Sequence, residues 1–94
     1  MTTKIVVFPA QTLEQAKDMA RKILEKQLGD VVRIYKDVYQ TWLEDGKVGE
    51  DNIVTLRVRT TEDRVEELHK FVKSIHPWPV FCFEVLSSEY KDFE

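Results

Sequence analysis

Two long segments of alternating polarity, on either side of an Asp-Gly pair, limit the folds open to this chain more than any other feature. In residues 31–42 and 53–60, apolar side chains alternate with polar or aromatic ones, which is the two-residue period of a β-strand. Between them, Asp45-Gly46 tolerates the positive φ angles of a tight hairpin turn. We therefore predict a long antiparallel hairpin with a projecting polar tip, to which residues 49–52 add a bulge or a wider return.

The alternation also predicts two different faces for this hairpin. The apolar face should pack against helices and consists of Val32, Ile34, Val38, Val54, Leu56 and Val58. The opposite face should carry aromatic and charged side chains, namely Arg33, Tyr35, Tyr39, Arg57 and Arg59. Because aromatic residues and arginine are enriched at subunit contacts, the second face favours self-association.

A short strand and an amphipathic helix precede the hairpin. Residues 4–8 are apolar and mostly β-branched, and Pro9 should end this strand because proline cannot donate to a sheet ladder. Thr12 and Gln15 form a capping-box pattern in front of apolar positions that recur every three or four residues. This pattern predicts a helix from Thr12 onward, and we expect Gly29 to end it.

A second helix and a last strand follow the hairpin. Thr60 or Thr61 is the expected N-cap of this helix, and Pro77 should stop it at His76 because a proline disfavours helical geometry in the residue before it. Residues 80–86 are predicted to form the last strand, and a polar tail follows them.

The resulting order is β-α-β-β-α-β. Two right-handed β-α-β crossovers interleaved in one sheet predict an α+β, ferredoxin-like split sandwich with both helices on one face of an antiparallel sheet. We expect residues 1–94 to form a single domain, because the chain is too short for a second core. A domain of this size buries little surface, so it gains from self-association.

Charge and cysteine content exclude several classes of protein. Lys and Arg number 14 and Asp and Glu 17, for a net charge of −3, which disfavours nucleic-acid partners and anionic membranes. The single cysteine, Cys82, excludes an internal disulfide. No basic leader and no membrane-length apolar run is present, so we expect a cytoplasmic protein.

His69, His76 and Cys82 are the principal candidates for soft metal ligands. The two histidines are seven positions apart, which places them on roughly one helix face, and Cys82 could approach from the adjacent strand. A thiolate with imidazoles suits Cu(I) or zinc, so copper or another divalent metal ion is a candidate cofactor. The alternative is that all three residues serve packing or surface roles.

The polar tip of the hairpin supplies a second candidate cation site. Glu44, Asp45, Glu50 and Asp51 could collect hard cations through their carboxylate oxygens. A hydrated turn without a bound ion explains the same residues equally well, because no calcium-loop spacing is present.

No enzyme signature is present, so we expect a binding protein. The chain has neither a glycine-rich nucleophile elbow nor a phosphate-binding loop. RNA-recognition modules share the β-α-β-β-α-β order, but they need stacking aromatic residues in the third strand, and residues 53–59 contain none. An RNA-recognition-type or other ferredoxin-like ligand-binding module is the alternative function.

Two segments resemble the CutA family of divalent-cation-tolerance proteins. Residues 39–47, Tyr-Gln-Thr-Trp-Leu-Glu-Asp-Gly-Lys, are similar to the family's Tyr-Trp-Trp-Glu-Gly-Lys hairpin. Residues 76–80, His-Pro-Trp-Pro-Val, are similar to its His-Pro-Tyr-Glu-Val segment. This chain departs from the family in lacking a cysteine at the start of the second strand, and in having Phe81-Cys82 where the family has Pro-Glu.

The resemblance implies a trimeric binding or regulatory protein. It implies a homotrimer in which the long hairpin pairs with neighbouring chains, a role in tolerance of copper and other divalent ions, and a pocket between subunits for a metal ion or a small anion. On this basis Tyr39, Trp42, Lys47 and Trp78 would line the pocket. The alternative is that the aromatic residues simply bury area at the interface.

Overall fold

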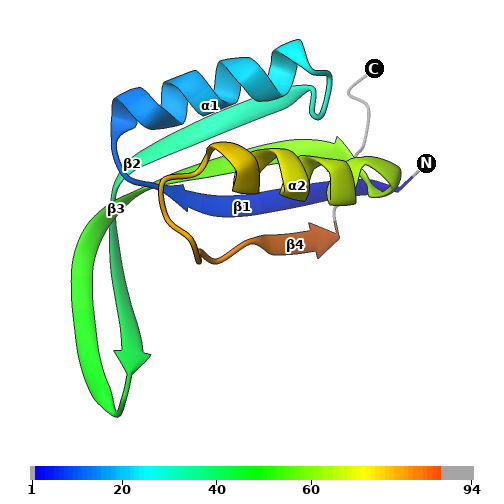
Figure 1. Cartoon of the computed structure of the whole chain (residues 1–94). Helices are drawn as coiled ribbons and strands as arrows, with labels where there is room; N and C mark the ends of the chain where they lie inside the picture. The colour runs from blue at the N-terminus through cyan, green and yellow to red at the C-terminus, as the bar shows by residue number, and fades with distance from the viewer. Residues whose placement is uncertain (1, 88–94) are drawn as a thin grey trace, which may run out of the picture.

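Two helices cover one face of a four-stranded antiparallel sheet in the computed structural model, which describes residues 2–87 (Figure 1). The elements in chain order are β1 (Thr3–Ala10), α1 (Leu13–Glu25), β2 (Val31–Glu44), β3 (Lys47–Thr61), the 3-10 helix η1 (Glu62–Arg64), α2 (Val65–Ile75) and β4 (Glu84–Ser87). The strand order is β2-β3-β1-β4, which confirms the predicted ferredoxin-like α+β fold. The polar tail expected after the last strand lies, from residue 88 on, outside the described residues.

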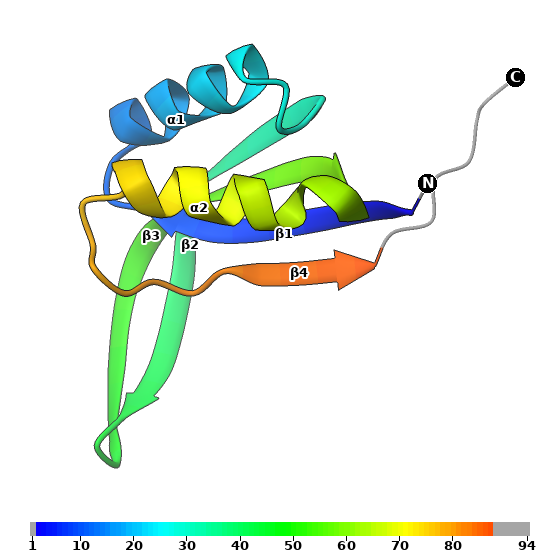
Figure 2. The same ribbon diagram turned by 45° about the vertical axis from the view of Figure 1, so that its right-hand side comes forward.

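The core lies between the helices and the sheet (Figure 2). Both helices contribute one apolar stripe, as the three- and four-residue spacing predicted. The largest fully buried side chains are Val6, Phe8, Met19, Ile23, Leu28, Leu56, Val58, Leu68 and Val72. None of the helices formed by residues 2–87 is long and apolar enough to cross a bilayer.

Helix α1 begins as predicted but ends differently. The Thr12 hydroxyl accepts a hydrogen bond from the Gln15 N–H at 3.1 Å, which confirms the N-cap. The helix ends at Glu25, not near Gly29, because Gln27 adopts a left-handed φ of 58°. The N–H groups of Gln27 and Leu28 then donate to the carbonyls of Leu24 and Ile23, respectively, which is the Schellman arrangement.

Gly29 is required for close packing instead. A Cβ atom at this position would lie 2.6 Å from Val58 Cγ1 and 3.0 Å from the Arg59 carbonyl oxygen. The absence of a side chain therefore lets the α1–β2 connection pass directly over β3.

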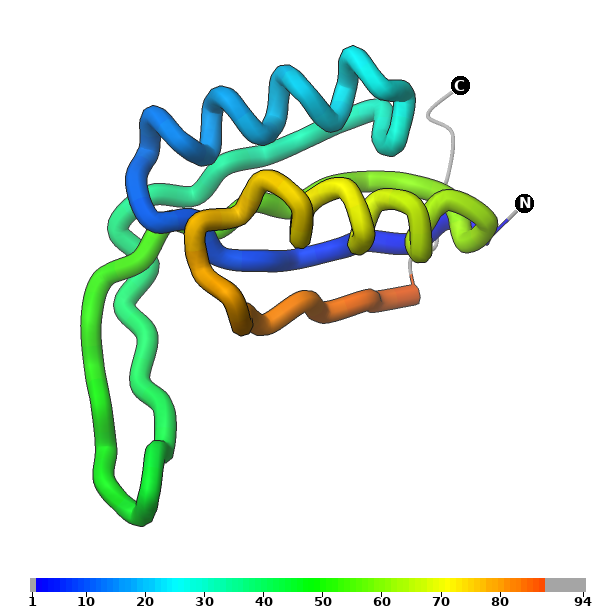
Figure 3. The backbone as a smooth tube through the Cα atoms, in the orientation of Figure 1, coloured from blue at the N-terminus to red at the C-terminus, as the bar shows by residue number. Residues whose placement is uncertain are grey.

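The distal parts of β2 and β3, residues 38–53, form an arm that projects from the body of the domain (Figure 3). The arm is longer than predicted, because residues 49–52 continue β3 and pair with β2 as far as the turn at Asp45-Gly46. These two residues have φ angles of 51° and 76°, as expected for a tight hairpin turn. The molecule is accordingly elongated, with extents of 46 × 25 × 22 Å.

The bulge lies in β2, not in residues 49–52. Tyr35 pairs with Thr55 and Val38 with Ile53, so β2 carries one extra residue between these pairs, and Asp37 there has a φ of 58°. An extra residue reverses which side chains point to which face. The predicted faces were therefore wrong beyond the bulge: Val38 lies on the sheet face away from the helices, and Tyr39 lies on the helix-side face of the arm.

Strand β1 does not end at Pro9 but continues to Ala10. β4 pairs only with residues 4–7 of β1, so no ladder hydrogen bond is lost on that edge at Pro9. β4 itself begins at Glu84 instead of residue 80. Of the two predicted caps of the second helix, Thr61 is the N-cap residue of η1, which leads into α2, but its hydroxyl donates to the Asp63 carboxylate and caps no backbone N–H. The Thr60 hydroxyl donates to the Leu28 carbonyl at 2.8 Å.

Candidate functional site

A groove of about 810 Å³ lies between the arm and the segment that leads into β4. Its walls come from β1, from β2 and β3 beyond the bulge, and from residues 78–84. Trp42 and Trp78, two of the four residues expected in a pocket, both line it. Tyr39 and Lys47, the other two, do not belong to its lining.

The extra residue at the bulge turns the Tyr39 side chain to the face of the arm opposite the groove. Its phenol points to that face and donates a hydrogen bond to the Glu50 carboxylate. This bond to a carboxylate raises the pKa of the Tyr39 hydroxyl above its ordinary value of 10.0. Lys47 pairs with Glu44 across the strands at the tip of the arm.

The groove is acidic. Glu44 and Asp51 from the arm and Glu84 from the start of β4 line it, and no lysine, arginine or histidine is among the described residues of its lining. Lys47, the cross-strand neighbour of Glu44, does not line the groove, so the described lining itself carries three carboxylates and no cation, and it attracts positive ligands. Glu84 was not predicted as a site residue, although its position two residues after Cys82 places both on one side of an extended segment.

The predicted acidic tip is divided between two environments. Glu44 and Asp51 line the groove, whereas Glu50 is bound by Tyr39 on the other face and Asp45 forms the turn. The four carboxylates therefore do not form one calcium-type cluster at the tip of the arm.

Trp42 is held flat against the arm by Gly49. The two residues face each other across β2 and β3, and a Cβ at position 49 would lie 2.5 to 2.7 Å from atoms of the indole ring. Only glycine leaves room for this packing. The ring therefore forms a defined wall of the groove while remaining 39% exposed.

His76 fixes the other wall. Its Nε2 lies 2.7 Å from the Pro9 carbonyl oxygen, and its Nδ1 accepts a hydrogen bond from the Trp78 backbone N–H at 3.1 Å. A carbonyl oxygen only accepts, so we assign the hydrogen to Nε2 and the neutral ring form. The ring also stacks on Phe81, with centroids 4.1 Å apart. His76 thus positions both Trp78 and Phe81 at the groove.

The three predicted soft metal ligands do not come together within the chain. His76 uses both ring nitrogens for backbone hydrogen bonds. His69 packs its ring against Phe83, with centroids 4.6 Å apart, and lines a separate recess. Cys82 alone lines the groove, where it is a free and exposed thiol. Within residues 2–87, no group of three or more His, Cys, Asp or Glu side chains is arranged to hold a metal ion.

The similarity to known proteins covers nearly the whole chain. The sequence model of the CutA1 divalent ion tolerance protein family matches residues 4–93. A CutA homolog from Xenopus laevis is 33% identical over 87 residues, which cover 93% of this chain and 55% of the relative. The chain thus spans about half the length of this curated relative.

Solved structures agree with this similarity. The divalent cation tolerance protein Cut A1 of Thermus thermophilus has a TM-score of 0.89 and 26% identity, and the match covers 96% of this chain and 87% of that one. The periplasmic divalent cation tolerance protein CutA of Archaeoglobus fulgidus, at 24% identity, has the same fold, with a TM-score of 0.86 over 95% of this chain and 86% of that one.

A ferredoxin-like domain with a projecting hairpin arm and an acidic, tryptophan-lined groove is the class of protein described here. The chain belongs to the CutA1 family of divalent ion tolerance proteins. This assignment confirms the family resemblance of residues 39–47 and 76–80.

Proposed function

We propose that the protein is a homotrimeric binding module for a divalent metal ion, copper foremost, and not an enzyme. The observation that carries this proposal is the charge of the groove: three carboxylates and a thiol line it without any basic side chain among its described residues. This lining favours a cation over the small anion that the family resemblance implied. A thiol beside carboxylates suits borderline ions such as copper and zinc better than magnesium.

The ligand set would be completed by a second copy of the chain. The described residues hold no three-ligand cluster within one chain, so side chains of one copy must combine with those of its neighbour. Self-association is supported by the arm, whose apolar tip residues Leu43 and Val48 are 74% and 75% exposed. A closed ring of copies would cover these residues and the strand edges of the arm.

Metal titration tests the binding proposal. We expect Cu(II) and Zn(II) to bind by calorimetry and Mg(II) to bind far more weakly. Cys82→Ser and Glu84→Gln should each weaken copper binding by about 10-fold or more, because each removes one candidate ligand. Glu66→Gln, on the exposed face of α2, removes the same charge away from the groove and serves as the control. Equal copper affinity in all four proteins would contradict the assignment to the groove.

Sedimentation equilibrium tests the assembly separately. We expect three chain masses at micromolar concentration, and we expect Leu43→Glu to shift the protein toward monomers because it places a charge in the proposed contact. A wild-type monomer at this concentration would refute the trimer. A trimer without copper binding would retain the assembly and refute only the metal role.

The cytoplasmic location and the RNA-recognition alternative bear on the same proposal. We infer a cytoplasmic protein from the sequence, although the Archaeoglobus fulgidus relative is described as periplasmic.

Binding of unlabelled RNA at moderate salt would favour the RNA-recognition alternative. The acidic groove on the open face of the sheet argues against it, because it repels phosphate groups.

A further inference from the structure

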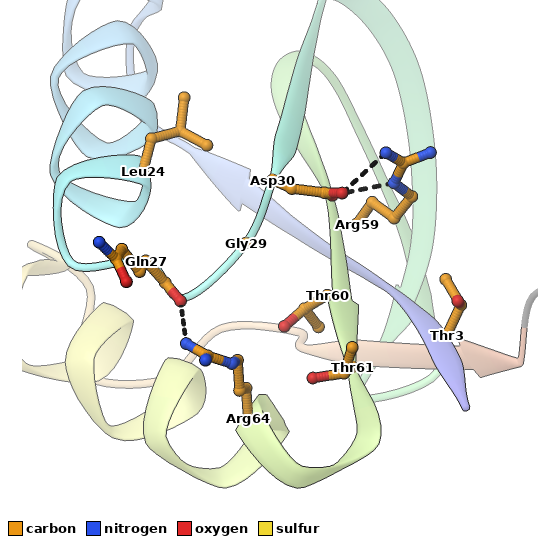
Figure 4. Close-up of a pocket in the computed structure, with 9 residues that line it drawn as sticks. All are labelled: Thr3, Leu24, Gln27, Gly29, Asp30, Arg59, Thr60, Thr61 and Arg64. Carbon is orange, nitrogen blue, oxygen red and sulfur yellow. Dashed lines mark hydrogen bonds and ion pairs between the residues drawn. The ribbon is translucent and has the colours of Figure 1, made fainter. Parts of the chain in front are cut away.

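A second cavity, of about 400 Å³, is lined by nine residues (Figure 4) and lies at the end of the domain away from the arm (Figure 1). It is open to solvent and is lined by the start of β1, the end of α1, the α1–β2 connection, the end of β3 and the 3-10 helix η1. Its lining shares no residue with the acidic groove. The volume suits a small molecule.

Hydrogen bonds hold the walls of this cavity in place. The Asp30 N–H donates to the Arg59 carbonyl at 3.1 Å, and the buried Thr60 hydroxyl donates to the Leu28 carbonyl at 2.8 Å. Arg59 also binds the Asp30 carboxylate through Nε and Nη2 at 2.9 and 2.7 Å (Figure 4). The cavity therefore exists before a ligand binds, which lowers the entropic cost of binding.

The cavity presents one positive charge that is not neutralised by an ion pair. Arg59 is paired with Asp30, but Arg64 forms no ion pair with any carboxylate in residues 2–87. Its guanidinium donates one hydrogen bond, to the Gln27 carbonyl oxygen, which fixes its position on the wall. A guanidinium carries several N–H donors, so further donors remain for an acceptor in the cavity.

The neighbouring carboxylate is directed elsewhere. Asp63 accepts a hydrogen bond of 2.5 Å from the Thr61 hydroxyl and does not line the cavity. This hydrogen bond and, less strongly, the Arg64 charge lower the pKa of the Asp63 carboxyl, but Asp63 and Arg64 form no ion pair within residues 2–87. On the α1 side, Leu24 supplies an apolar surface that is 41% exposed. A ligand that satisfies both features has an anionic head and a short hydrocarbon chain.

We propose that this cavity binds a small organic monocarboxylate, with its carboxylate on Arg64 and its hydrocarbon chain against Leu24. A single guanidinium that forms no ion pair within residues 2–87 matches a single negative charge, and planar carboxylates fit the guanidinium fork. A phosphate dianion is less suitable, because Arg59, the other cation of the lining, is paired with Asp30 and so does not balance the second negative charge.

Titration of the ¹⁵N-labelled protein with butyrate, followed by NMR, tests this site. We expect saturable shifts of the amide signals of Gln27, Gly29, Asp30 and Thr61. Arg64→Gln should weaken butyrate binding by about 10-fold or more, because a charged hydrogen bond is lost. Arg21→Gln removes the same charge from the exposed face of α1 and should leave the affinity unchanged.

Three further measurements keep the test decisive. Leu24→Asp places a negative charge at a partly exposed helix position and should abolish binding even if Arg64→Gln folds poorly. Butylammonium, which has the same chain and the opposite charge, should not bind, and inorganic phosphate should bind more weakly than butyrate. Absence of saturable shifts, equal binding of butyrate and phosphate, equal binding of butyrate and butylammonium, or full affinity in Arg64→Gln would overturn the proposal.

Discussion

Replacing His76 by alanine should cost much more stability than a typical surface change, because this ring holds the segment that forms one wall of the groove. The ring is 9% exposed, so its interactions are not strongly screened by water. The substitution removes the hydrogen bonds to Pro9 and Trp78, worth about 1 to 1.5 kcal/mol each. It also removes the stack on Phe81, worth about 1 kcal/mol. We therefore expect a loss of about 3 to 4 kcal/mol.

Urea unfolding at one fixed protein concentration, followed by tryptophan fluorescence, measures this loss. The fixed concentration matters because self-association would add to the apparent stability. The midpoint should fall while the slope stays the same, as expected for a change in stability alone. His69→Ala is the matched control: within residues 2–87 this histidine makes a ring contact with Phe83 and no hydrogen bond, so it should lose less than about 1.5 kcal/mol.

Two milder variants separate the two hydrogen bonds of the ring. Asn at position 76 can accept from the Trp78 N–H, and Gln can donate to the Pro9 carbonyl, so both should fall between wild type and His76→Ala. A loss in His76→Ala no larger than in His69→Ala would refute the structural role assigned to His76. So would abolished copper binding in His76→Ala with unchanged stability, since that result would make His76 a metal ligand.

Substitutions at three other positions test local features that shape the domain. Gly29→Ala should destabilise by about 1 to 3 kcal/mol in urea unfolding, because its methyl group meets Val58 at 2.6 Å. Asp37→Val should cost about 1 to 2 kcal/mol by the same assay, whereas Asp37→Gly should be nearly neutral, since only the first places a β-branched residue at a φ of 58°. Arg59 lowers the pKa of the Asp30 carboxyl below 3.8, so this contribution to stability is complete above that pH and is lost as the pH falls toward the lower value. Asp30→Asn should therefore differ from wild type more at neutral pH than in acid.

The order of helices and strands could be predicted because it depends on local periodicity. The helix stripes, the Thr12 cap and the Asp45-Gly46 turn are all properties of a few neighbouring residues. The end of α1 was wrong because Gln27, which has no strong preference for a left-handed φ, adopts one so that Leu28 can be buried. Gly29 was predicted to end the helix because glycine is common at helix ends. Its lack of a side chain instead allows close contact with β3, and a contact between distant segments leaves no local sequence pattern.

The candidate site was predicted only in part, for a similar reason. Trp42, Trp78 and Cys82 reach one groove, but they were expected in two separate sites. Glu84 was missed because the last strand was predicted to begin at residue 80, so its start was not expected to border the arm. His76 was a candidate metal ligand, with a packing role as the alternative, because a sequence does not show that two backbone groups already occupy its ring nitrogens.

The bulge at Asp37 decides which side chains of the arm face the groove and which face the other side. Without the extra residue, strict alternation would turn Tyr39 and Leu43 toward the open face of the sheet and Trp42 away from it. With it, Trp42 and Glu44 face the groove, while Leu43 and Val48 form an exposed apolar pair on the other side of the arm. One residue in a left-handed conformation therefore places Glu44 on the groove side of the arm and the exposed Leu43 on the other side. The proposed ligand binding and the proposed self-association thus depend on the same local feature, because both faces are set by the same register.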